Sequence, residues 1–486
     1  MKRINRRNFL KVSGAGVAGA GVFSGVTLAN WRVWGANDDV RVGIIGFNGK
    51  GKTHIKAFER SGKGSRVVAL CDVDKSILKR GKDMLKKKEI EVEAFVDIRK
   101  MLEMKDLDAI AIATPNHWHS LATVWGCQAG KDVYVEKPCS HNIFEGRKCV
   151  EAATKYKRIV QHGTQSRSAG GLAEAFKTMQ SGKWGKILWT RGLCYKPRGS
   201  IGKTEGPQKV PDSVDYDLWC GPAPKGPLRR RRFHYDWHWF WDFGNADIGN
   251  QGVHEMDMAR WALGQDTLPG AVISLGGRFV VDDDAEVPNT QIAFYDYKPY
   301  PMFFEVRGLG RKKGQRAMDH YREAQIGVVV QCEGGYFAGG ANGGRFYDKE
   351  HKVAQKFGGG GGAHQANFIK AVRSRKPEDQ KAPILEGHRS AALCHLANVS
   401  YRVGQEKSFE EAKEAVKVDK ELTDSYERML AHLEANGVDL KKSKVACGAA
   451  LKFDPEAEKF VGESSDAANK LVSREYRKPF VVPEQV

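Results

Sequence analysis

A lysine at the end of a predicted buried strand is the strongest candidate for chemistry in this sequence. Lys137 stands in Glu136-Lys137-Pro138, directly after the apolar run 133–135. Oxidation of an alcohol by hydride loss also releases a proton, which requires a base within hydrogen-bond distance. A partly desolvated lysine has its pKa lowered towards neutrality and can serve as that base. We therefore predict that Lys137 transfers the proton and that Glu136 positions Lys137 or a ribose; a surface lysine beginning a turn is the alternative.

A glycine-rich turn predicts a dinucleotide site earlier in the chain. The β-branched run 40–45 is followed by this turn and then by a helical pattern through His54. Backbone amides at a helix N-terminus bind a pyrophosphate, provided that no Cβ intrudes. Gly46 and Gly51 occupy the first and last glycine positions of the pattern, and Asn48 replaces the middle one. Because Asn tolerates a left-handed conformation, we expect Asn48 and Gly49 to share the role of that glycine.

An acidic residue follows the next predicted strand, 66–70. Asp72 lies 26 residues after Gly46, near the spacing expected for the acid that binds a ribose. A carboxylate at this place accepts hydrogen bonds from ribose hydroxyls and repels a 2′-phosphate. The sequence therefore favours NAD over NADP, although Asp72 could instead be only a turn residue.

An aromatic run with neighbouring polar residues predicts a substrate pocket. Residues 234–243 combine Trp, Phe, Tyr and His side chains. Aromatic faces beside polar groups suit a sugar ring, whereas a hydrophobic anchor for a sheet is the alternative reading. Spacing of apolar residues from 251 predicts a helix with His254 near its N-terminus, open towards the cleft. His254 is the second catalytic candidate, and a structural histidine is the alternative. No metal-ligand spacing is present, so we predict no metal site.

The elements that must position these residues alternate between strand and helix. Strands are predicted at 108–113, 133–135 and 159–162, and helices at 117–129 and 143–155. This order predicts an α/β fold with an N-terminal Rossmann domain, a doubly wound parallel sheet that binds ligands at the carboxyl ends of its strands. The strand ends add Thr114, Asn116, His117 and Gln165 to the cofactor-binding candidates Gly46, Asn48, Gly49, Gly51, Asp72, Glu136 and Lys137.

Beyond residue 167 the pattern changes to longer strands with irregular loops between them. Strands are predicted at 187–194, 271–281, 290–297, 302–307 and 327–332. They predict a C-terminal α+β domain with an open, mostly antiparallel sheet.

The sequence from about 40 to 403 resembles the Gfo/Idh/MocA oxidoreductases, the glucose-fructose oxidoreductase and inositol dehydrogenase type. The motifs are the turn 46–51, Cys71-Asp72-Val73-Asp74, Thr114-Pro115-Asn116-His117, Glu136-Lys137-Pro138 and Gly252-Val253-His254-Glu255-Met256-Asp257. The resemblance implies that Lys137 lies beside the nicotinamide and that the second sheet builds a carbohydrate pocket; we expect a homo-oligomer through that sheet. The family commonly has an Asp four residues before the histidine. Asn250 stands there, and the nearest acid is Asp247, so both join the catalytic candidates.

The first residues resemble a twin-arginine export signal. Arg6 and Arg7 precede Phe9-Leu10-Lys11 and a weakly apolar run, 12–29, that is a poor membrane span. We therefore expect a periplasmic or otherwise extracytoplasmic protein, exported by the twin-arginine route, that carries a tightly bound cofactor. The predicted parts are the signal and linker 1–36, the Rossmann domain 37–166, the substrate and oligomerisation domain 167–404 and a C-terminal extension 405–486. Within the extension we expect a helix to residue 433 and a strapping segment near 476–480.

Length, charge and cysteine usage set the limits of this interpretation. At 486 residues the chain exceeds the ~250–300 residues at which single cores stop growing. The net charge is +19, but the clusters 229–232 and 311–313 do not alternate with aromatics, which argues against nucleic acid. We expect solvated basic surface, or else a field that concentrates an anionic substrate. The nine cysteines show no paired spacing, so they predict neither zinc nor a disulfide framework.

Three functions remain open from sequence. The first is hydride transfer between NAD(H) and a sugar or cyclitol carbon. The second is glycoside cleavage by transient oxidation and elimination, known in an exported branch of the family with a Tyr-Pro-x-His signature; Gln251-Gly252-Val253-His254 lacks its tyrosine. The third is a non-catalytic, secreted carbohydrate-binding protein on the same scaffold.

Overall fold

The computed structural model describes residues 39–60, 64–359 and 362–486. The predicted export signal lies outside the described residues. Within them, no helix is both long and apolar enough to cross a bilayer, and no group of three or more His, Cys, Asp or Glu side chains is placed to hold a metal ion.

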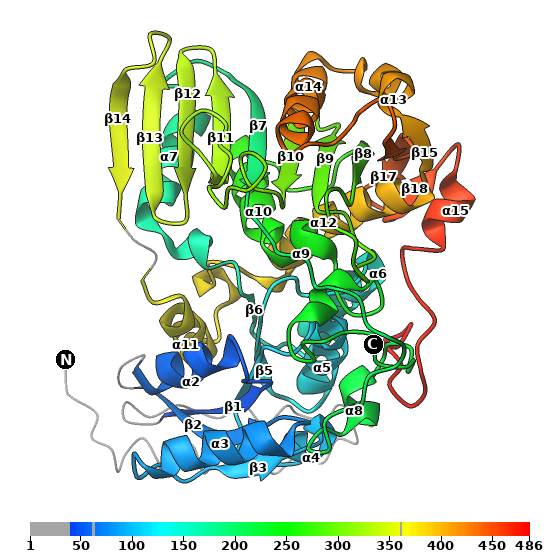
Figure 1. Ribbon diagram of the computed structural model, residues 1–486. Helices are drawn as coiled ribbons and strands as arrows, with labels where there is room; N and C mark the ends of the chain where they lie inside the picture. The colour runs from blue at the N-terminus through cyan, green and yellow to red at the C-terminus, as the bar shows by residue number, and fades with distance from the viewer. Residues whose placement is uncertain (1–38, 61–63, 360–361) are drawn as a thin grey trace, which may run out of the picture. The chain divides into compact units, whose positions relative to one another are not determined.

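The N-terminal domain is a six-stranded parallel sheet with the strand order β3-β2-β1-β4-β5-β6 (Figure 1). Its strands are β1 (Val40–Ile45), β2 (Ser65–Cys71), β3 (Glu93–Phe95), β4 (Ala109–Ile112), β5 (Asp132–Val135) and β6 (Val160–His162). Its helices are α2 (Gly51–Arg60), α3 (Lys75–Lys86), α4 (Ile98–Leu102), α5 (Asn116–Gln128) and α6 (Ile143–Lys155). The order reverses between β1 and β4, which is where a doubly wound sheet binds its ligand.

The second domain contains a larger, mostly antiparallel sheet with the path β14-β13-β12-β11-β7-β10-β9-β8-β16-β15. Its strands are β7 (Ile187–Cys194), β8 (Ala271–Gly277), β9 (Thr290–Tyr295), β10 (Met302–Arg307), β11 (Ile326–Cys332), β12 (Gly335–Gly340), β13 (Gly343–Asp348), β14 (Val353–Gly358), β15 (Gln405–Ser408), β16 (Lys444–Cys447), β17 (Leu451–Asp454) and β18 (Lys459–Val461). Only β7 and β10 pair in parallel along this path within the described residues. The fold class predicted from sequence is confirmed.

Helices pack on both faces of the second sheet. The helices that follow the Rossmann strands are α7 (Gly170–Gln180), α8 (Tyr216–Cys220), α9 (Ala246–Asn250), α10 (Gly252–Leu263), α11 (His364–Ser374), α12 (Ile384–Val403), α13 (Phe409–Val416), α14 (Lys420–Ala435) and α15 (Ser465–Asn469). Of these, α8 and α11 lie beside the Rossmann domain (Figure 1). Alternate residues of β10 enter two different cores: Phe304 packs in the core that contains α10 and α12, and Phe303 packs in the core that contains α13 and α14. Helix α10, which carries His254, therefore packs on one face of the second sheet, and α14 packs on the opposite face.

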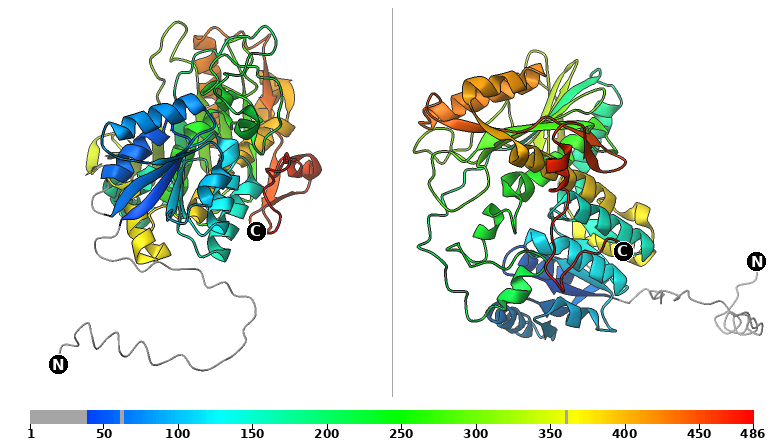
Figure 2. Two further views of the ribbon diagram at one scale, coloured as in Figure 1. Left: turned by 90° about the horizontal axis from the view of Figure 1, so that it is seen from below. Right: turned by 90° about the vertical axis from the view of Figure 1, so that its right-hand side faces the viewer.

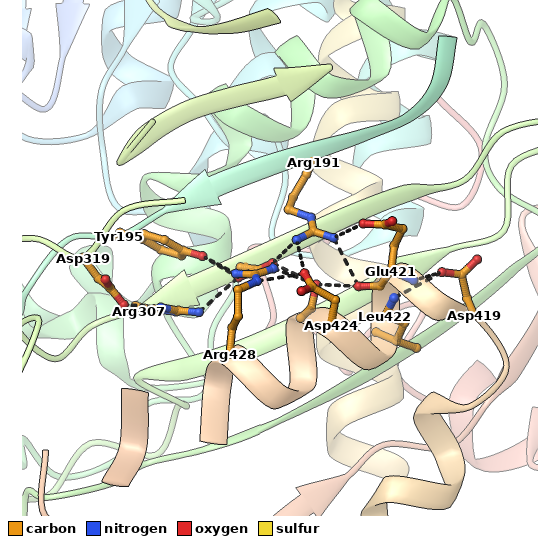
Figure 3. A network of polar contacts seen from close by, with 11 residues as sticks. Arg191, Tyr195, Arg307, Asp319, Asp419, Glu421, Leu422, Asp424 and Arg428 are labelled. Atoms are coloured by element: carbon orange, nitrogen blue, oxygen red, sulfur yellow. Dashed lines mark hydrogen bonds and ion pairs between the residues drawn. The ribbon is translucent and has the colours of Figure 1, made fainter. Parts of the chain in front are cut away.

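Buried ion pairs join α14 to the sheet (Figure 3). Glu305 of β10 is fully buried and accepts a 2.9 Å hydrogen bond from Arg428 of α14. Arg191 of β7, also fully buried, lies 3.2 Å from the same carboxylate and 3.1 Å from Asp424. Burial would raise the pKa of Glu305, but the charges of Arg428 and Arg191 hold it well below its usual range.

Two sequence predictions differ from the structure. Residues 405–408 form strand β15 rather than helix, because they pair with β16 in register. The cluster 229–232 is not uniformly solvated: Arg230 is 3% exposed, and its guanidinium lies over the rings of Trp219 and Phe233 at 4.3 and 4.9 Å. Aromatic faces stabilise this buried cation.

The segment after α15 returns to the Rossmann domain (Figure 2, right). Phe480 is buried, and its ring lies 5.5 Å from Trp118 and 6.4 Å from Trp125 of α5. Arg477 is anchored to Asp217 by a 2.9 Å hydrogen bond. Residues 476–486 thus form a strap against α5, in agreement with the strap expected near 476–480.

Candidate functional site

One cavity of about 460 Å³ brings most of the predicted site residues together. It lies at the carboxyl ends of the Rossmann strands and is closed by residues 234–254 of the second domain. The predicted residues on its wall are Gly46, Asn48, Gly49, Asp72, Thr114, Asn116, Glu136, Lys137, Gln165, Asn250 and His254. Gly51, His117 and Asp247 do not line it.

The glycine-rich turn between β1 and α2 is shaped by two glycines. Gly46 has φ +72°, and a Cβ there would lie 2.9 Å from the backbone nitrogen of Thr114. A Cβ on Gly51 would lie 2.2 Å from the Gly46 carbonyl oxygen. Among the described residues of the turn, only Gly46 has a positive φ, so the expectation that Asn48 adopts a left-handed conformation was wrong. The turn therefore accepts Asn48 without strain.

The ribose end of the cavity carries the Asp72 carboxylate, and Asp74 lies behind the cavity wall. Asp72 accepts hydrogen bonds from the backbone N–H groups of Phe47, at 3.2 Å, and Asp74, at 3.0 Å. Burial raises the pKa of Asp72 although these two bonds oppose the shift. Asp74 caps α3 and lies 2.9 Å from His234 Nε2, which fixes the aromatic loop over this end.

The cavity fits a nicotinamide dinucleotide. Gly46 leaves open the backbone approach that a pyrophosphate needs, and Asp72 stands where ribose hydroxyls would donate. The hydroxyl oxygen of Thr114, on the cavity wall, is buried and has no partner among the described residues. A bound ligand would supply that partner.

Lys137 faces the second domain across this cavity. Its ammonium donates to the carbonyl oxygen of Asn250 and lies 3.5 Å from the Asn250 side-chain oxygen. Burial lowers the pKa of Lys137, and the negative charges of Glu136 and Asp247 oppose this effect. The amine is thus prepared to exchange a proton.

Glu136 does not project freely into the cavity. It is 4% exposed, and it accepts hydrogen bonds from Gln165 at 3.1 Å and from the Lys137 backbone at 3.3 Å. His54 Nε2 lies 3.0 Å from Oε1, the oxygen that also accepts from Gln165. Burial alone would raise the pKa of Glu136, but His54 and the charges of Lys50 and Lys137 bring it below its usual range. Glu136 is therefore an ionised positioning group.

His254 and Asn250 complete the substrate end. His254 lies in the first turn of α10, where burial and the Lys137 charge lower its pKa to about 3. Its imidazole is therefore neutral at pH 7. The Asp247 carboxylate accepts a 2.7 Å hydrogen bond from Arg198 Nε and a 3.5 Å one from the Asn250 amide, and it contacts neither Lys137 nor His254 directly. The described residues therefore contain no direct Lys–Asp–His relay.

The aromatic run divides between the cavity and the core. Tyr235, Trp237 and His238 line the cavity, and the rings of Trp237 and His238 stack at 3.6 Å. Trp239 and Phe243 are buried in the hydrophobic core. The run thus contributes to both the cavity wall and the core, and Trp237 belongs to both.

Some residues near the cavity were not identified from sequence. His117 was a cofactor candidate, but its Nε2 is bound to the Trp219 carbonyl at 2.9 Å and it faces away from the cavity. Lys50 lies in the glycine-rich turn but was not a candidate, Trp219 lines the cavity outside any motif, and His54 gave only a helical pattern. Long-range contacts, which spacing does not encode, bring these residues to the site.

Known proteins resemble both domains. A model described as "Oxidoreductase family, NAD-binding Rossmann fold" matches residues 40–164, and one described as "Oxidoreductase family, C-terminal alpha/beta domain" matches residues 187–294. Inositol 2-dehydrogenase of Salmonella typhimurium is 26% identical over 180 residues, which cover 37% of this chain and 52% of that protein. A glycosyl hydrolase family 109 protein of Shewanella baltica is 30% identical over 179 residues, covering 32% of this chain and 39% of that protein. The chain thus spans about half the length of these curated relatives, or less.

Solved structures share the fold. The WlbA dehydrogenase of Bordetella pertussis, in complex with NADH and UDP-GlcNAcA, has a TM-score of 0.57 at 20% identity, covering 75% of this chain and 97% of that one. Levoglucosan dehydrogenase, in complex with NADH and levoglucosan, has a TM-score of 0.54 at 16% identity, covering 74% and 97%. At these identities the likeness concerns the fold.

Proposed function

We propose that this member of the Gfo/Idh/MocA oxidoreductase family transfers a hydride between a bound nicotinamide dinucleotide and a hydroxyl-bearing carbon of a sugar, cyclitol or sugar derivative. The observation that carries the proposal is the single cavity that joins the Gly46 turn to Lys137 and His254. The relatives named as inositol and levoglucosan dehydrogenases support the substrate class.

The protein's own groups account for binding and proton transfer. The bound dinucleotide would supply the hydride acceptor or donor. Backbone amides of the turn and Asp72 would hold its pyrophosphate and ribose. Lys137, with its lowered pKa, accepts the substrate hydroxyl proton during oxidation and returns it during reduction. His254, neutral at pH 7, hydrogen-bonds the same substrate oxygen or its neighbour.

The remaining contacts orient the substrate and restrict water. Asn250 presents its carbonyl to Lys137 and fixes the direction of the ammonium group. Stacked Trp237 and His238 offer an apolar surface to the C–H face of a sugar ring. We also propose that NAD is preferred to NADP, because the Asp72 carboxylate on the cavity wall would repel a 2′-phosphate.

The test begins with the purified full chain. Released dinucleotide is identified by chromatography after acid and heat extraction, and turnover is screened with sugars, cyclitols and their acids. Lys137→Met should retain the dinucleotide and lose at least ~10²-fold in kcat, since general acid–base catalysis contributes about 10²–10⁴-fold. A wild-type protein that neither contains nor binds NAD(P) would refute the function. Full activity of Lys137→Met would refute the role of this lysine.

A second candidate function is glycoside cleavage by transient oxidation, favoured by the similarity to the glycosyl hydrolase family 109 protein. It requires the same cavity and Lys137. Aryl-glycosides distinguish the two functions, because cleavage without net change in NADH indicates the second.

Export by the twin-arginine route is a further part of the proposal and rests on Arg6, Arg7 and the apolar run that follows them. A periplasmic enzyme would retain its dinucleotide through successive turnovers. Replacing both arginines by lysine should leave the protein in the cytoplasm, as measured by cell fractionation.

A further inference from the structure

A histidine behind the cavity wall contacts the carboxylate next to the proposed catalytic lysine. His54 belongs to α2, is fully buried and does not line the cavity. Its ring lies edge-on to Tyr134 at 5.0 Å. Sequence spacing assigned His54 only to a helical pattern, and nothing in the proposed hydride transfer uses it directly.

The two ring nitrogens of His54 have different surroundings. Nδ1 lies 3.4 Å from the amide nitrogen of Gln365, which can only donate, so Nδ1 is the acceptor. In the neutral ring the proton is then on Nε2, which lies 3.0 Å from Glu136 Oε1. The N–H direction does not meet the alignment of a hydrogen bond, so this contact is mainly electrostatic.

The Glu136 carboxylate is enclosed on its other sides. Gln165 donates to Oε1, the Lys137 backbone donates to Oε2, and a Cβ on Gly163 would lie 2.9 Å from Oε2. An ionised carboxylate that is 4% exposed is costly unless its partners compensate for lost water. His54 is one of these partners, and its replacement by an apolar group would favour the protonated acid.

We infer that His54 is a positioning residue for Lys137: fixed by Gln365, it keeps Glu136 ionised and in place, and Glu136 in turn favours the charged form of the neighbouring ammonium. The inference rests on the proposed function for its catalytic meaning. Without His54, Glu136 takes up a proton more readily, and Lys137 loses the negative charge that opposes its desolvation.

The test measures the titration of Lys137 without a substrate. The purified full chain is acetylated in trace amounts across a pH series, and mass spectrometry follows the labelling of Lys137. In His54→Leu the pKa of Lys137 should fall by about 1 or more, the size expected when a nearby opposite charge is lost. His54→Gln keeps an N–H donor and should lie closer to wild type. Gln365→Leu should shift the titration in the same direction by less.

A matched control separates this effect from lost stability. His388 is also fully buried and lies 2.7 Å from a glutamate, Glu458, but lines no part of the cavity. His388→Leu should destabilise the fold and leave the Lys137 titration unchanged. Once a substrate is known, the acidic limb of the kcat profile should move to lower pH in His54→Leu alone.

An unchanged Lys137 titration in His54→Leu, or an equal shift in His388→Leu, would overturn the inference. If His54→Leu does not fold, Gln365→Leu decides, because a Lys137 titration identical to wild type in that variant excludes the role. Failure of the proposed function gives a different result, namely a wild-type protein without dinucleotide or turnover. The labelling experiment needs neither.

Discussion

Glu255, next to His254, is a buried acid whose charge the fold does not compensate. It is 2% exposed, and Gln251 donates to Oε1 at 3.2 Å, while Oε2 has no partner among the described residues. Burial raises the pKa of Glu255 to about 8, against the opposing bond from Gln251. The side chain therefore carries a proton in the folded protein at pH 7.

This shift predicts a pH dependence of stability. Between the ordinary pKa of 4.5 and about 8, the folded state holds a proton at Glu255 that the unfolded chain has released. This proton stabilises the folded state fully below pH 4.5. The stabilisation is lost as the pH rises through 8, and the free energy of unfolding falls by up to ~1.4 kcal/mol per pH unit. Glu255→Gln should remove this slope, as measured by urea unfolding from pH 5 to 8. Parallel pH profiles for Glu255→Gln and the wild type would contradict the shift; exposed Glu456→Gln is the control.

Asp72 sets the second prediction at this scale. Asp72→Ser removes the charge that would repel a 2′-phosphate but keeps a hydrogen-bonding group. We expect the ratio of kcat/KM for NADP to that for NAD to rise by about tenfold or more, equivalent to ~1.4 kcal/mol. Asp83→Ser, on the exposed side of α3, should leave the ratio unchanged. An unchanged ratio in Asp72→Ser would show that the carboxylate does not select the cofactor.

At the scale of elements, α14 is bound to the second sheet by charge as well as by apolar packing. Arg428→Met should destabilise the protein by about 3–5 kcal/mol, because Glu305 would remain buried with less compensation. Chemical unfolding measures the loss. Arg345→Met replaces an exposed side chain of β13 and should have little effect. An equal loss of stability in both variants would argue against the ion pair as the cause.

Sequence patterns predicted the elements whose apolar residues repeat clearly. Helix α6 and strands β7 and β10 have the predicted limits. Strands β12 and β13 were missed because glycines at 335, 339, 340, 343 and 344 interrupt the alternation, and their pairing across a sheet supplies the missing order. The spacing of residues along the sequence does not indicate which strands pair with each other.

The candidate site was predictable to the same extent. Motifs identified Gly46, Asp72, Lys137 and His254, which the structure brings to one cavity. Spacing could not show that Asp247 pairs with Arg198, since 49 positions separate them. The contact of His54 with Glu136 likewise depends on how α2 packs beside β5.

At the scale of the whole molecule, the strap formed by residues 476–486 joins the Rossmann domain to distant sequence. Phe480 is 2% exposed, and its neighbour Val481 is 40% exposed. Phe480→Ala should cost about 3–5 kcal/mol in the free energy of unfolding, as for other buried phenylalanines, whereas Val481→Ala should cost far less. Thermal and denaturant unfolding provide the measurement. Similar small losses in both variants would mean that the strap contributes little to stability.

The sheet of the second domain bears on assembly. Helices α13 and α14 contact β9, β15 and β16. This chain itself therefore covers part of the sheet face that lies opposite to α10. A homo-oligomer through this sheet, which we propose from the family resemblance, would therefore use strands or edges that these helices leave open. Sedimentation of the purified protein measures the assembly.

The strap also constrains the order in which the molecule is made. Phe480, Val482 and Val486 belong to the same hydrophobic core as Ile45 and Ile112 of the first sheet. The first domain to leave the ribosome thus waits for more than 300 further residues before its core is complete. Until then Trp118, which also lines the cavity, has its outer face uncovered. The core of the first domain is consequently completed only after the strap has been synthesised.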